Sequence, residues 1–373
     1  MRGSFELREE IDRSGVKYFL QTSFLPHREQ IESSFFKNGV LFDTVVAKAD
    51  GSMPESRLKE LSREVHLENK RKFLFLLDVR DRIKDSINPK PHLRLAQALL
   101  KRNLYTEAIK EAQLAITKGD KSSLPLIVIG KSFYGLGEYK KAFAALEEGI
   151  QLDPDYPDLH NLMGSIYLIE RKCSKAIESF KRSISLNLYY GAPYFNLVRA
   201  YLLNTIVKED YELSKGLEEK FKTNIDKAAQ LCPFIQGEKL DEAKSFFGEQ
   251  RYREALEVLD GITESEKQDG VEDIFLELYL EVLHDGEMLS DEEIERFLER
   301  VRQIIDQNPS YADGYNSLGI LYTAKCKIFM DKASEAFTKA LEINKKYKKA
   351  QKNLRLAEND RQGIFILLKA LLD

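Results

Sequence analysis

The stretch IGKSFYGLGEYKKAFAALEEGIQLDP, residues 129–154, has the apolar spacing of helices but carries small residues where leucine would bury more surface. Small residues recur in the same register 34 positions before and after it: Ala96 and Ala108, Gly130 and Ala142, Gly164 and Ala176. The segments 95–116, 129–150 and 163–184 align around them without a gap. This self-similarity indicates an internal repeat.

Each copy contains two apolar periodicities of the i, i+3/i+4 type, separated by a short polar or glycine-containing turn. The pattern predicts a helix, a turn and a second helix. A small residue on each helix lets the two backbones approach closely where they cross, and larger neighbours such as Phe133, Leu146 and Phe180 fill the space around the crossing. We therefore expect the small residues at the helix crossings.

The repeat continues beyond the third copy, with insertions. The fourth copy is expected to close at Pro233, about 11 residues later than the period predicts, so it needs a longer inter-helix loop or extended helices. The fifth copy, at 240–262, returns to normal spacing. The sixth copy, at 271–309, is irregular and lacks the usual small residue in its first helix.

The last copy and the C-terminal segment follow at 315–373. The seventh copy has two extra residues in its predicted turn and keeps the residues typical of the repeat, which are Gly319, Tyr322, Ala333, Phe337 and Ala340. Residues 345–373 are predicted to form a terminal helix or helix pair that covers the end of the stack.

The repeated pattern resembles the tetratricopeptide repeat. The second copy carries it as Gly130, Phe133, Tyr139, Ala142, Gly149 and Pro154. Three tyrosines stand three residues before the second-helix alanine, as that family's turn prefers: Tyr105, Tyr139 and Tyr252. The chain has no tryptophan, so other residues replace the family's usual first-helix aromatic. The resemblance covers roughly 89–344 and implies a mainly α fold, an α-solenoid of about seven helix pairs over residues 87–344.

Residues 1–86 do not show the repeat and predict a small α+β module with an antiparallel sheet. Runs rich in β-branched and aromatic residues predict strands near 16–24, 29–36 and 40–47, with Asn38-Gly39 as a hairpin turn between the last two. Ser52 and Glu55 form a capping box for a helix that is expected to reach about Lys84.

The apolar stripe of that predicted helix consists of Leu58, Leu61 and Val65. Its i, i+3, i+7 spacing predicts that this face of the helix packs on the sheet. The stripe stops at the polar stretch 68–72, where we expect the helix to allow a break.

Length and composition fit a repeat array. A chain of 373 residues is long for one compact core but natural for units that contact only their neighbours. The net charge of -4 disfavours a broadly basic nucleic-acid binder. Three scattered cysteines, Cys173, Cys232 and Cys326, suggest neither a disulfide framework nor a metal site, so a reducing compartment is expected.

The polar start lacks a hydrophobic signal core, and no run approaches the roughly 20 apolar residues that span a bilayer. We therefore predict a cytoplasmic protein with no membrane span.

No enzyme, metal site or cofactor is predicted. The five histidines do not share metal-ligand spacing on one helix, and none has a cysteine or serine partner in a nucleophile motif. The sequence GLGEY lies between helices, whereas a phosphate-binding loop follows a strand. Two basic clusters, at 69–72 and 345–349, are short and have acidic neighbours, so we interpret them as solvated helix faces.

A stack of helix pairs exposes a concave surface built mainly from first helices, which suits an extended peptide or a helix of another protein. In the tetratricopeptide arrangement the outward positions of copies two to four include Asp158 and the candidate groove residues, which are Lys131, Asn161, Ser165, Asn196 and Arg199. Asparagine amides can bond both the N–H and the C=O of a peptide, and Lys131 with Arg199 could hold a carboxylate.

The leading hypothesis is a non-enzymatic interaction scaffold that binds a protein or peptide partner in this groove. One alternative is a signalling or transcriptional regulator whose solenoid senses a ligand and whose N-terminal module transmits the signal. Another is an RNA-associated helical repeat protein. The segment 363–373 is more apolar than one stripe of a surface helix requires, so it is predicted either to fold into the last groove or to form a homodimer.

Overall fold

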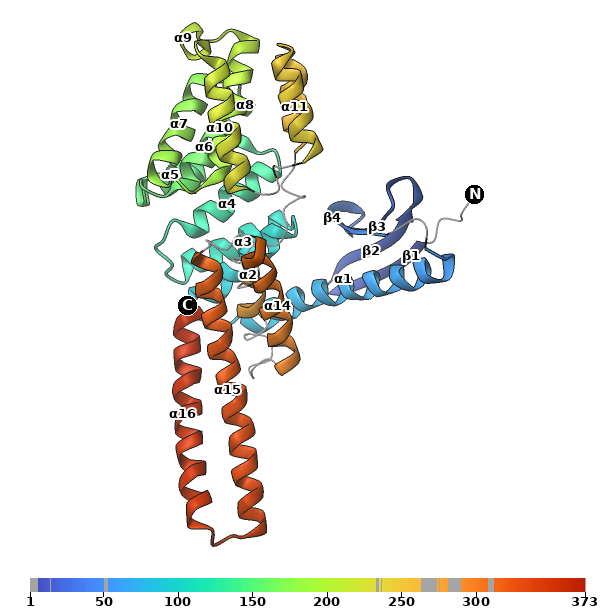
Figure 1. Cartoon of the computed structure of the whole chain (residues 1–373), viewed down its shortest axis with the longest axis vertical. Helices are drawn as coiled ribbons and strands as arrows, with labels where there is room; N and C mark the ends of the chain where they lie inside the picture. The colour runs from blue at the N-terminus through green and yellow to red at the C-terminus, as the bar shows by residue number, and fades with distance from the viewer. Residues whose placement is uncertain are drawn as a thin grey trace. The chain divides into compact units, whose positions relative to one another are not determined.

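The computed structural model describes residues 6–13, 15–49, 53–232, 235, 237–262, 274, 276–280, 290–307 and 312–372. The chain divides into two compact units. One comprises Met1–Arg71 and Ile87–Gln268, and the other comprises Lys72–Ser86 and Asp269–Asp373. The predicted class is confirmed, because the described chain is mainly helical and carries one antiparallel sheet near its N-terminus (Figure 1).

Four antiparallel strands form the sheet in the order β1-β2-β3-β4, and their bounds are Glu6–Arg13, Val16–Leu25, Gln30–Lys37 and Val40–Lys48. The three predicted strands are confirmed, and Asn38-Gly39 is the two-residue turn between β3 and β4, with positive φ at both residues. β1 was not predicted, since six of its eight residues are charged and only Leu7 and Ile11 are apolar. It forms an edge of the sheet by pairing with β2.

Helix α1, Glu55–Ile83, packs on the sheet as predicted, and Figure 1 shows the strands lying along it. Leu58 joins Phe24 and Ile31 in a buried cluster, against which Leu61 and Val65 pack. Ser52 lies outside the described residues, so the capping box remains a prediction.

The break allowed near 68–72 does not occur, because α1 is continuous through this stretch. Asn69 in this stretch, and His66 just before it, are buried against polar residues of the sheet. His66 Nδ1 lies 2.9 Å from Thr22 Oγ1, and Asn69 Nδ2 donates to Ser33 Oγ at 3.1 Å. The apolar stripe is interrupted where the sheet itself presents hydroxyl groups, and the hydrogen bonds compensate for their burial.

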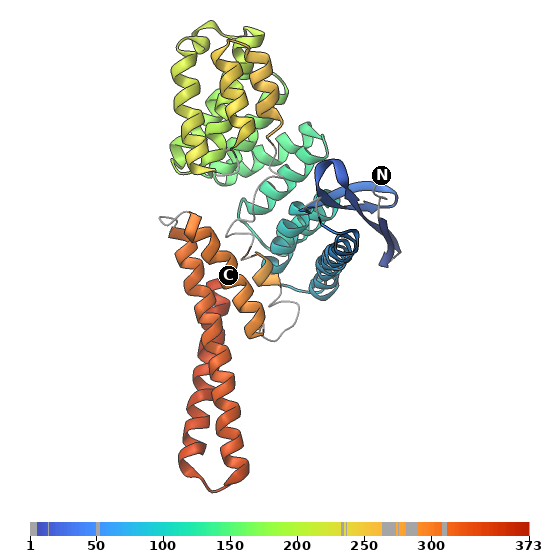
Figure 2. The same cartoon turned by 45° about the vertical axis from the view of Figure 1, so that its right-hand side comes forward.

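Five helix pairs follow in the same unit as the sheet, and Figure 2 shows the first ones as successive antiparallel pairs. The bounds are α2 Pro89–Lys101 and α3 Tyr105–Thr117; α4 Leu124–Gly135 and α5 Tyr139–Leu152; α6 Pro157–Ile169 and α7 Cys173–Leu186; α8 Gly191–Val207 and α10 Leu217–Leu231; α11 Glu238–Gly248 and α12 Tyr252–Asp260. The short helix α9, Tyr211–Ser214, lies between α8 and α10.

The small residues stand where the helices cross, as predicted. A Cβ atom on Gly130 would lie 2.6 Å from Leu146, and one on Gly164 would lie 2.6 Å from Phe180. These separations are shorter than any normal contact between carbon atoms. Glycine is therefore needed for the helices of the second and third pairs to approach this closely.

Each regular turn ends its first helix in the same way. The residues Asn103, Gly137 and Arg171, which lie 34 positions apart, all adopt the left-handed conformation. In each turn the next residue donates its backbone N–H to a carbonyl five positions earlier, as from Glu138 to Phe133 at 2.9 Å. This is the Schellman arrangement, which satisfies carbonyl groups left over at a helix end.

The insertion in the fourth copy lengthens α8 to 17 residues and adds α9. The copy therefore has both an extended helix and a longer inter-helix segment, the two alternatives that were predicted. The inserted loop also caps a neighbour, since the Glu209 carboxylate accepts hydrogen bonds from the backbone N–H groups of Cys173 and Ser174 at the start of α7. Burial raises the pKa of Glu209, but these bonds outweigh it and hold the pKa below its usual range. Pro233 lies outside the described residues.

The second unit contains α14 Asp291–Gln307, α15 Ala312–Ile343 and α16 Lys348–Leu372. Most of the first half of the sixth copy lies outside the described residues. α15 and α16 run side by side as an antiparallel hairpin (Figures 1 and 2). The C-terminal segment is thus one helix, α16, while the domain boundaries at residues 86 and 344 remain predictions.

The predicted turn of the seventh copy is wrong. Where the second copy has Gly137 in the left-handed conformation, five residues before its second-helix alanine, the seventh has Ile328. A β-branched residue strongly resists that conformation, and the surrounding sequence contains neither glycine nor proline. The segment therefore continues as one straight helix of 32 residues.

Candidate binding groove on the first helices

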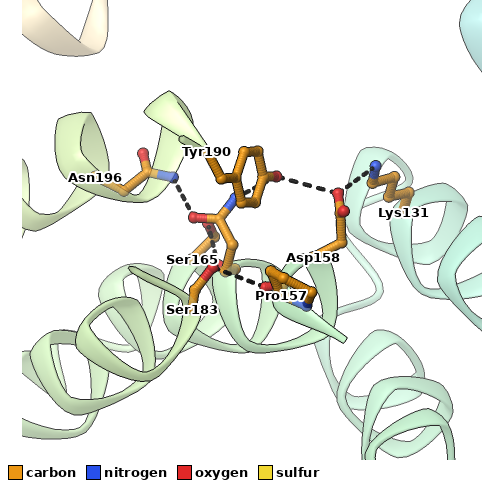
Figure 3. Close-up of polar contacts among 8 residues, drawn as sticks. Lys131, Pro157, Asp158, Ser165, Ser183, Tyr190 and Asn196 are labelled. Carbon is orange, nitrogen blue, oxygen red and sulfur yellow. Dashed lines mark hydrogen bonds and ion pairs between the residues drawn. The ribbon is translucent and has the colours of Figure 1, made fainter. Parts of the chain in front are cut away.

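The candidate groove residues come from three successive first helices, α4, α6 and α8. Lys131 lies on α4, Asn161 and Ser165 lie on α6, and Asn196 and Arg199 lie on α8. The 34-residue period places these helices side by side in the stack, so equivalent positions form a row. Figure 3 shows Lys131 meeting Asp158 across neighbouring helices, with Tyr190 and Asn196 beside them.

The row begins with an acidic group held between two donors. Lys131 Nζ lies 3.4 Å from Asp158 Oδ1, and the Tyr190 hydroxyl donates to the same oxygen at 3.1 Å (Figure 3). Asn161 Nδ2 donates in turn to the Tyr190 oxygen at 3.2 Å. The tyrosine thereby connects the charged end of the row to its amides.

Two amides and a guanidinium continue the row. Asn196 Nδ2 donates to Asn161 Oδ1 at 3.0 Å, and Arg199 Nη1 donates to Asn196 Oδ1 at 3.0 Å. Arg199 also binds Asp260 at the end of α12 through two nitrogens, at 2.6 and 2.7 Å. We call this connected set the polar ladder; its members are Lys131, Asp158, Tyr190, Asn161, Asn196, Arg199 and Asp260.

Ser165 is the candidate that does not join the polar ladder. Its hydroxyl donates to the backbone carbonyl of Asn161 at 3.0 Å, one turn earlier in the same helix. Tyr190 and Asp260 belong to the ladder but were missed by sequence reasoning. Tyr190 precedes α8 and therefore lies outside the groove positions of the repeat. Asp260 lies close to Arg199 because α8 packs mainly against α12 rather than against α11.

The polar ladder is electrically balanced. Asp158 and Asp260 already pair with its two cations, so a free carboxylate would have to displace one of them. Asn161 is only 7% exposed, whereas the side chains of Lys131 and Arg199 are 38% and 26% exposed. The arrangement therefore offers one half-buried amide, that of Asn196, between a buried amide and an accessible cation, and it suits a neutral peptide main chain better than a terminal carboxylate.

A second feature lies on the second helices. A hollow of about 470 Å³ opens between α5, α6 and α7, and its walls include Phe143, Glu147, Tyr167, Lys175 and Glu178. Tyr167 stacks edge-on against Phe143, and the Lys175 ammonium lies 5.6 Å from the Tyr167 ring centre. This hollow lies away from the polar ladder, so substitutions in its walls can serve as controls for substitutions in the ladder.

In the described part of the chain, His92, His160 and Cys173 make structural contacts. His92 Nδ1 lies 2.8 Å from the Glu111 carboxylate in the first pair, and His160 Nε2 lies 2.7 Å from the Pro154 carbonyl. Burial raises the pKa of the Cys173 thiol to about 12, with the Glu209 carboxylate adding to the effect. Among the described residues no cluster of histidine, cysteine and carboxylate side chains could hold a metal, and no helix is long and apolar enough to cross a membrane.

Residues 130–168, which run from the second half of α4 through α5 and nearly all of α6, match the family model described as TPR repeat. This stretch of the chain is a tetratricopeptide repeat. The match falls on the copies whose spacing is most regular, while the neighbouring TPR units carry the insertions described above. A comparison with curated protein sequences finds no match.

Solved structures of other TPR proteins resemble parts of the chain. MamA is 21% identical over 44% of this chain and 92% of its own, with a TM-score of 0.35. PilF of Pseudomonas aeruginosa is 14% identical over 61% and 95%, with a TM-score of 0.36. YrrB, a TPR protein with an unusual peptide-binding site, is 12% identical over 64% and 95%, with a TM-score of 0.33. None of these likenesses bears on what this chain binds.

Proposed function

We propose that the protein is a non-enzymatic, cytoplasmic interaction scaffold that binds an extended protein segment along the polar ladder. The observation that carries the proposal is the continuity of the ladder across three first helices. Lys131, Asn161 and Asn196 stand on three successive first helices, although not at one repeat position, since they lie 30 and 35 residues apart where the period is 34. A peptide lying across the repeats would meet a polar group from each helix.

The asparagines are the groups best suited to such a peptide. Each amide oxygen in the polar ladder accepts one described hydrogen bond and retains a second lone pair, and each amide nitrogen has a second proton. Because neighbouring ladder groups hold the amides in place, little side-chain freedom would be lost on binding. We infer recognition of a peptide main chain, with side chains of the peptide read by the surrounding surface.

The regulator hypothesis draws support from the contact between the sheet and the first repeat. The Arg102 guanidinium lies 4.6 Å from the Phe35 ring centre and donates to the buried Asp43 carboxylate at 2.6 Å. Lys37 pairs with Glu107 on α3. A module anchored to the array by these groups is suited to respond to changes in the first repeat, as the alternative requires.

The RNA-associated and homodimer hypotheses receive less support. Lys70, in one of the two basic clusters, pairs with Glu9 at 2.6 Å, which leaves less positive charge for RNA. A homodimer through the end of α16 stays a proposal that rests on the exposure of Ile366, Leu367 and Leu371.

The test is a pair of matched surface variants. Affinity purification from the native organism and mass spectrometry would first supply a binding segment as a synthetic peptide. Changing Asn196 and Arg199 to Ala should weaken its binding about tenfold or more, since two half-buried groups of the ladder are lost. Changing Lys175 and Glu178 to Ala, in the hollow on the second helices, should leave the affinity unchanged. Unchanged affinity in the first variant with an intact helical spectrum would place the site elsewhere.

A further inference from the structure

The seventh repeat leaves its own internal contacts unmade. Nothing lies within 4 Å of the position that a Cβ atom on Gly319 would take, whereas the equivalent glycines 130 and 164 face large side chains. The seventh-copy counterpart of Leu146 is Phe337, which stands 18 residues after Gly319 in the same straight helix. At 1.5 Å per residue the two are about 27 Å apart along the helix, so they cannot meet within one chain.

A row of partly or fully exposed residues shares one face of α15. Four large residues and Ala336 recur every seven positions, at Tyr315, Tyr322, Phe329, Ala336 and Ile343. The small residues Gly319, Cys326, Ala333 and Ala340 stand between them. We call this set the α15 stripe. Its four large apolar side chains are 44% to 88% exposed. An average spacing of 3.5 residues is that of a helix packed along its length against another helix.

The α16 helix does not cover the α15 stripe, because it packs on another face. Ala324 and Ile328, which lie outside the stripe, are buried, and Asp331 on the same side accepts a hydrogen bond from Arg361 of α16 at 3.2 Å. A heptad pattern exposed on one face of a helix whose other face is packed requires a further partner if it is to be buried.

We propose that two copies of the chain pair through α15 in antiparallel orientation, each completing the seventh repeat of the other. The two-fold axis of this antiparallel pair lies between residues 327 and 328. Each large side chain of one copy then lies opposite a small residue of the other copy, with a register error of at most one residue. The pairs are Tyr315 with Ala340, Tyr322 with Ala333, Phe329 with Cys326, and Phe337 with Gly319. One register therefore produces all four pairs.

The second repeat shows two of these four pairs within one chain. In the second copy a Cβ atom on Gly149 would lie 3.6 Å from Leu126, and one on Gly130 would lie 2.6 Å from Leu146. The equivalent seventh-copy pairs are Ala340 with Tyr315 and Gly319 with Phe337. The pairing of two copies thus restores between chains the contacts that the straight helix prevents within one chain, which is the logic of a domain swap.

Charge and area both favour a second copy as the occupant. One flank of the α15 stripe, at 316, 323, 330 and 337, carries no charge. On the other flank Lys325 and Lys332 would approach each other near the axis, but each already pairs with carboxylates of α14, Lys332 with Asp291 at 2.7 Å.

The six half-exposed aromatic rings of two copies would bury roughly 600 Å². This is about half of the roughly 1,200 Å² of a small stable interface, before the other stripe residues are added.

Light scattering of the full chain tests the proposal. We expect a dimer whose dissociation constant rises by about 100-fold or more in Phe329→Asp, because a charge would be buried at the centre of the interface. Thr338→Asp, on the same helix outside the α15 stripe, should leave the dimer intact, and so should Ile366→Asp on α16. A monomeric wild type, or a dimer that Ile366→Asp dissociates and Phe329→Asp does not, would overturn the proposal.

Crosslinking of the wild-type protein tests the register without relying on a folded variant. Cys326 lies 1.5 residues from the proposed axis, so the two copies of its thiol would be only about 4.5 Å apart along the pair. A short bis-maleimide should therefore yield a covalent dimer that is lost in Cys326→Ala and kept in Cys232→Ala. A crosslinked dimer that persists in Cys326→Ala would contradict the α15 pairing.

Discussion

At the scale of single residues, one hydrogen atom in place of a methyl group allows the close helix crossing of the third pair. Gly164 is the clearest case, because a methyl carbon there would lie within 2.6 to 2.9 Å of three atoms of the Phe180 ring. The ring itself is fully buried and has no room to move away. Repeat spacing in the sequence identified this position without any structural information.

We predict that Gly164→Ala lowers the free energy of unfolding by about 1–3 kcal/mol, as overpacking of a close-packed core does. Gly248→Ala is the matched control, since this glycine also lies in a helix of the same unit but has nothing within 4 Å of the added carbon. Urea unfolding followed by circular dichroism measures both. Equal stability of the two variants would show that the crossing can relax.

The polar ladder shows what residue patterns can and cannot predict. Lys131, Asn161, Asn196 and Arg199 were identified because groove positions follow the repeat period. The pattern could not reveal that these side chains bind one another, since hydrogen bonds depend on side-chain rotamers and on Tyr190, a turn residue outside the period. The expected ligand changes as a result. Lys131 and Arg199 already pair with Asp158 and Asp260, so they are less suited to hold a carboxylate of a bound peptide.

At the scale of elements, the contact between the sheet and α3 depends on a buried ion pair. Burial raises the pKa of Glu107, but the bond and charge of Lys37, together with the Thr106 hydroxyl, outweigh it and hold the pKa below the usual 4.5. A lowered pKa means that the pair contributes stability above about pH 4.5 and loses it as the pH falls through the lowered value. The Lys37–Glu107 pair is therefore weaker in acid.

Replacing Lys37 by Met should reverse this behaviour. Without the ammonium group, burial raises the pKa of Glu107 against only the Thr106 hydroxyl and a backbone hydrogen bond, so the variant should be destabilised by about 3 kcal/mol near pH 7. The deficit should shrink as the pH falls and Glu107 becomes protonated. Unfolding midpoints from pH 3 to 7 measure the difference, and Lys17→Met, which removes an exposed pair with Glu10, is the control. A deficit independent of pH would contradict the assignment.

Elements also show why the second half of the chain was harder to predict. The seventh copy retains the family's glycine, aromatic and alanine positions, which identify the repeat but not its turn. The turn depends on one residue that tolerates the left-handed conformation, and Ile328 stands in that place. Residue identity at the packing positions and backbone conformation at the turn are separate requirements, and only the first is visible as a periodic pattern. β1 was missed for a related reason, since an exposed edge strand needs no apolar alternation.

At the scale of the whole molecule, the two compact units carry different proposed roles. The polar ladder lies entirely in the unit that contains the sheet and the five helix pairs, whereas the α15 stripe lies in the unit of α14, α15 and α16. A groove that binds one segment and a helix that binds a second copy would together present two equivalent grooves per assembly. Such an arrangement favours a partner that offers its binding segment more than once.

We therefore predict that affinity for a single soluble peptide and affinity for a densely immobilised one respond differently to loss of the dimer. Phe329→Asp should leave binding of the soluble peptide unchanged, because no ladder residue is altered. It should weaken retention on the immobilised peptide by about 100-fold, since the second binding event of a linked pair adds roughly that factor without any new contact. Surface plasmon resonance with the peptide first in solution and then on the surface measures both quantities. Equal retention of variant and wild type at high peptide density would mean that the two units act independently in binding, even if each proposed site is correct.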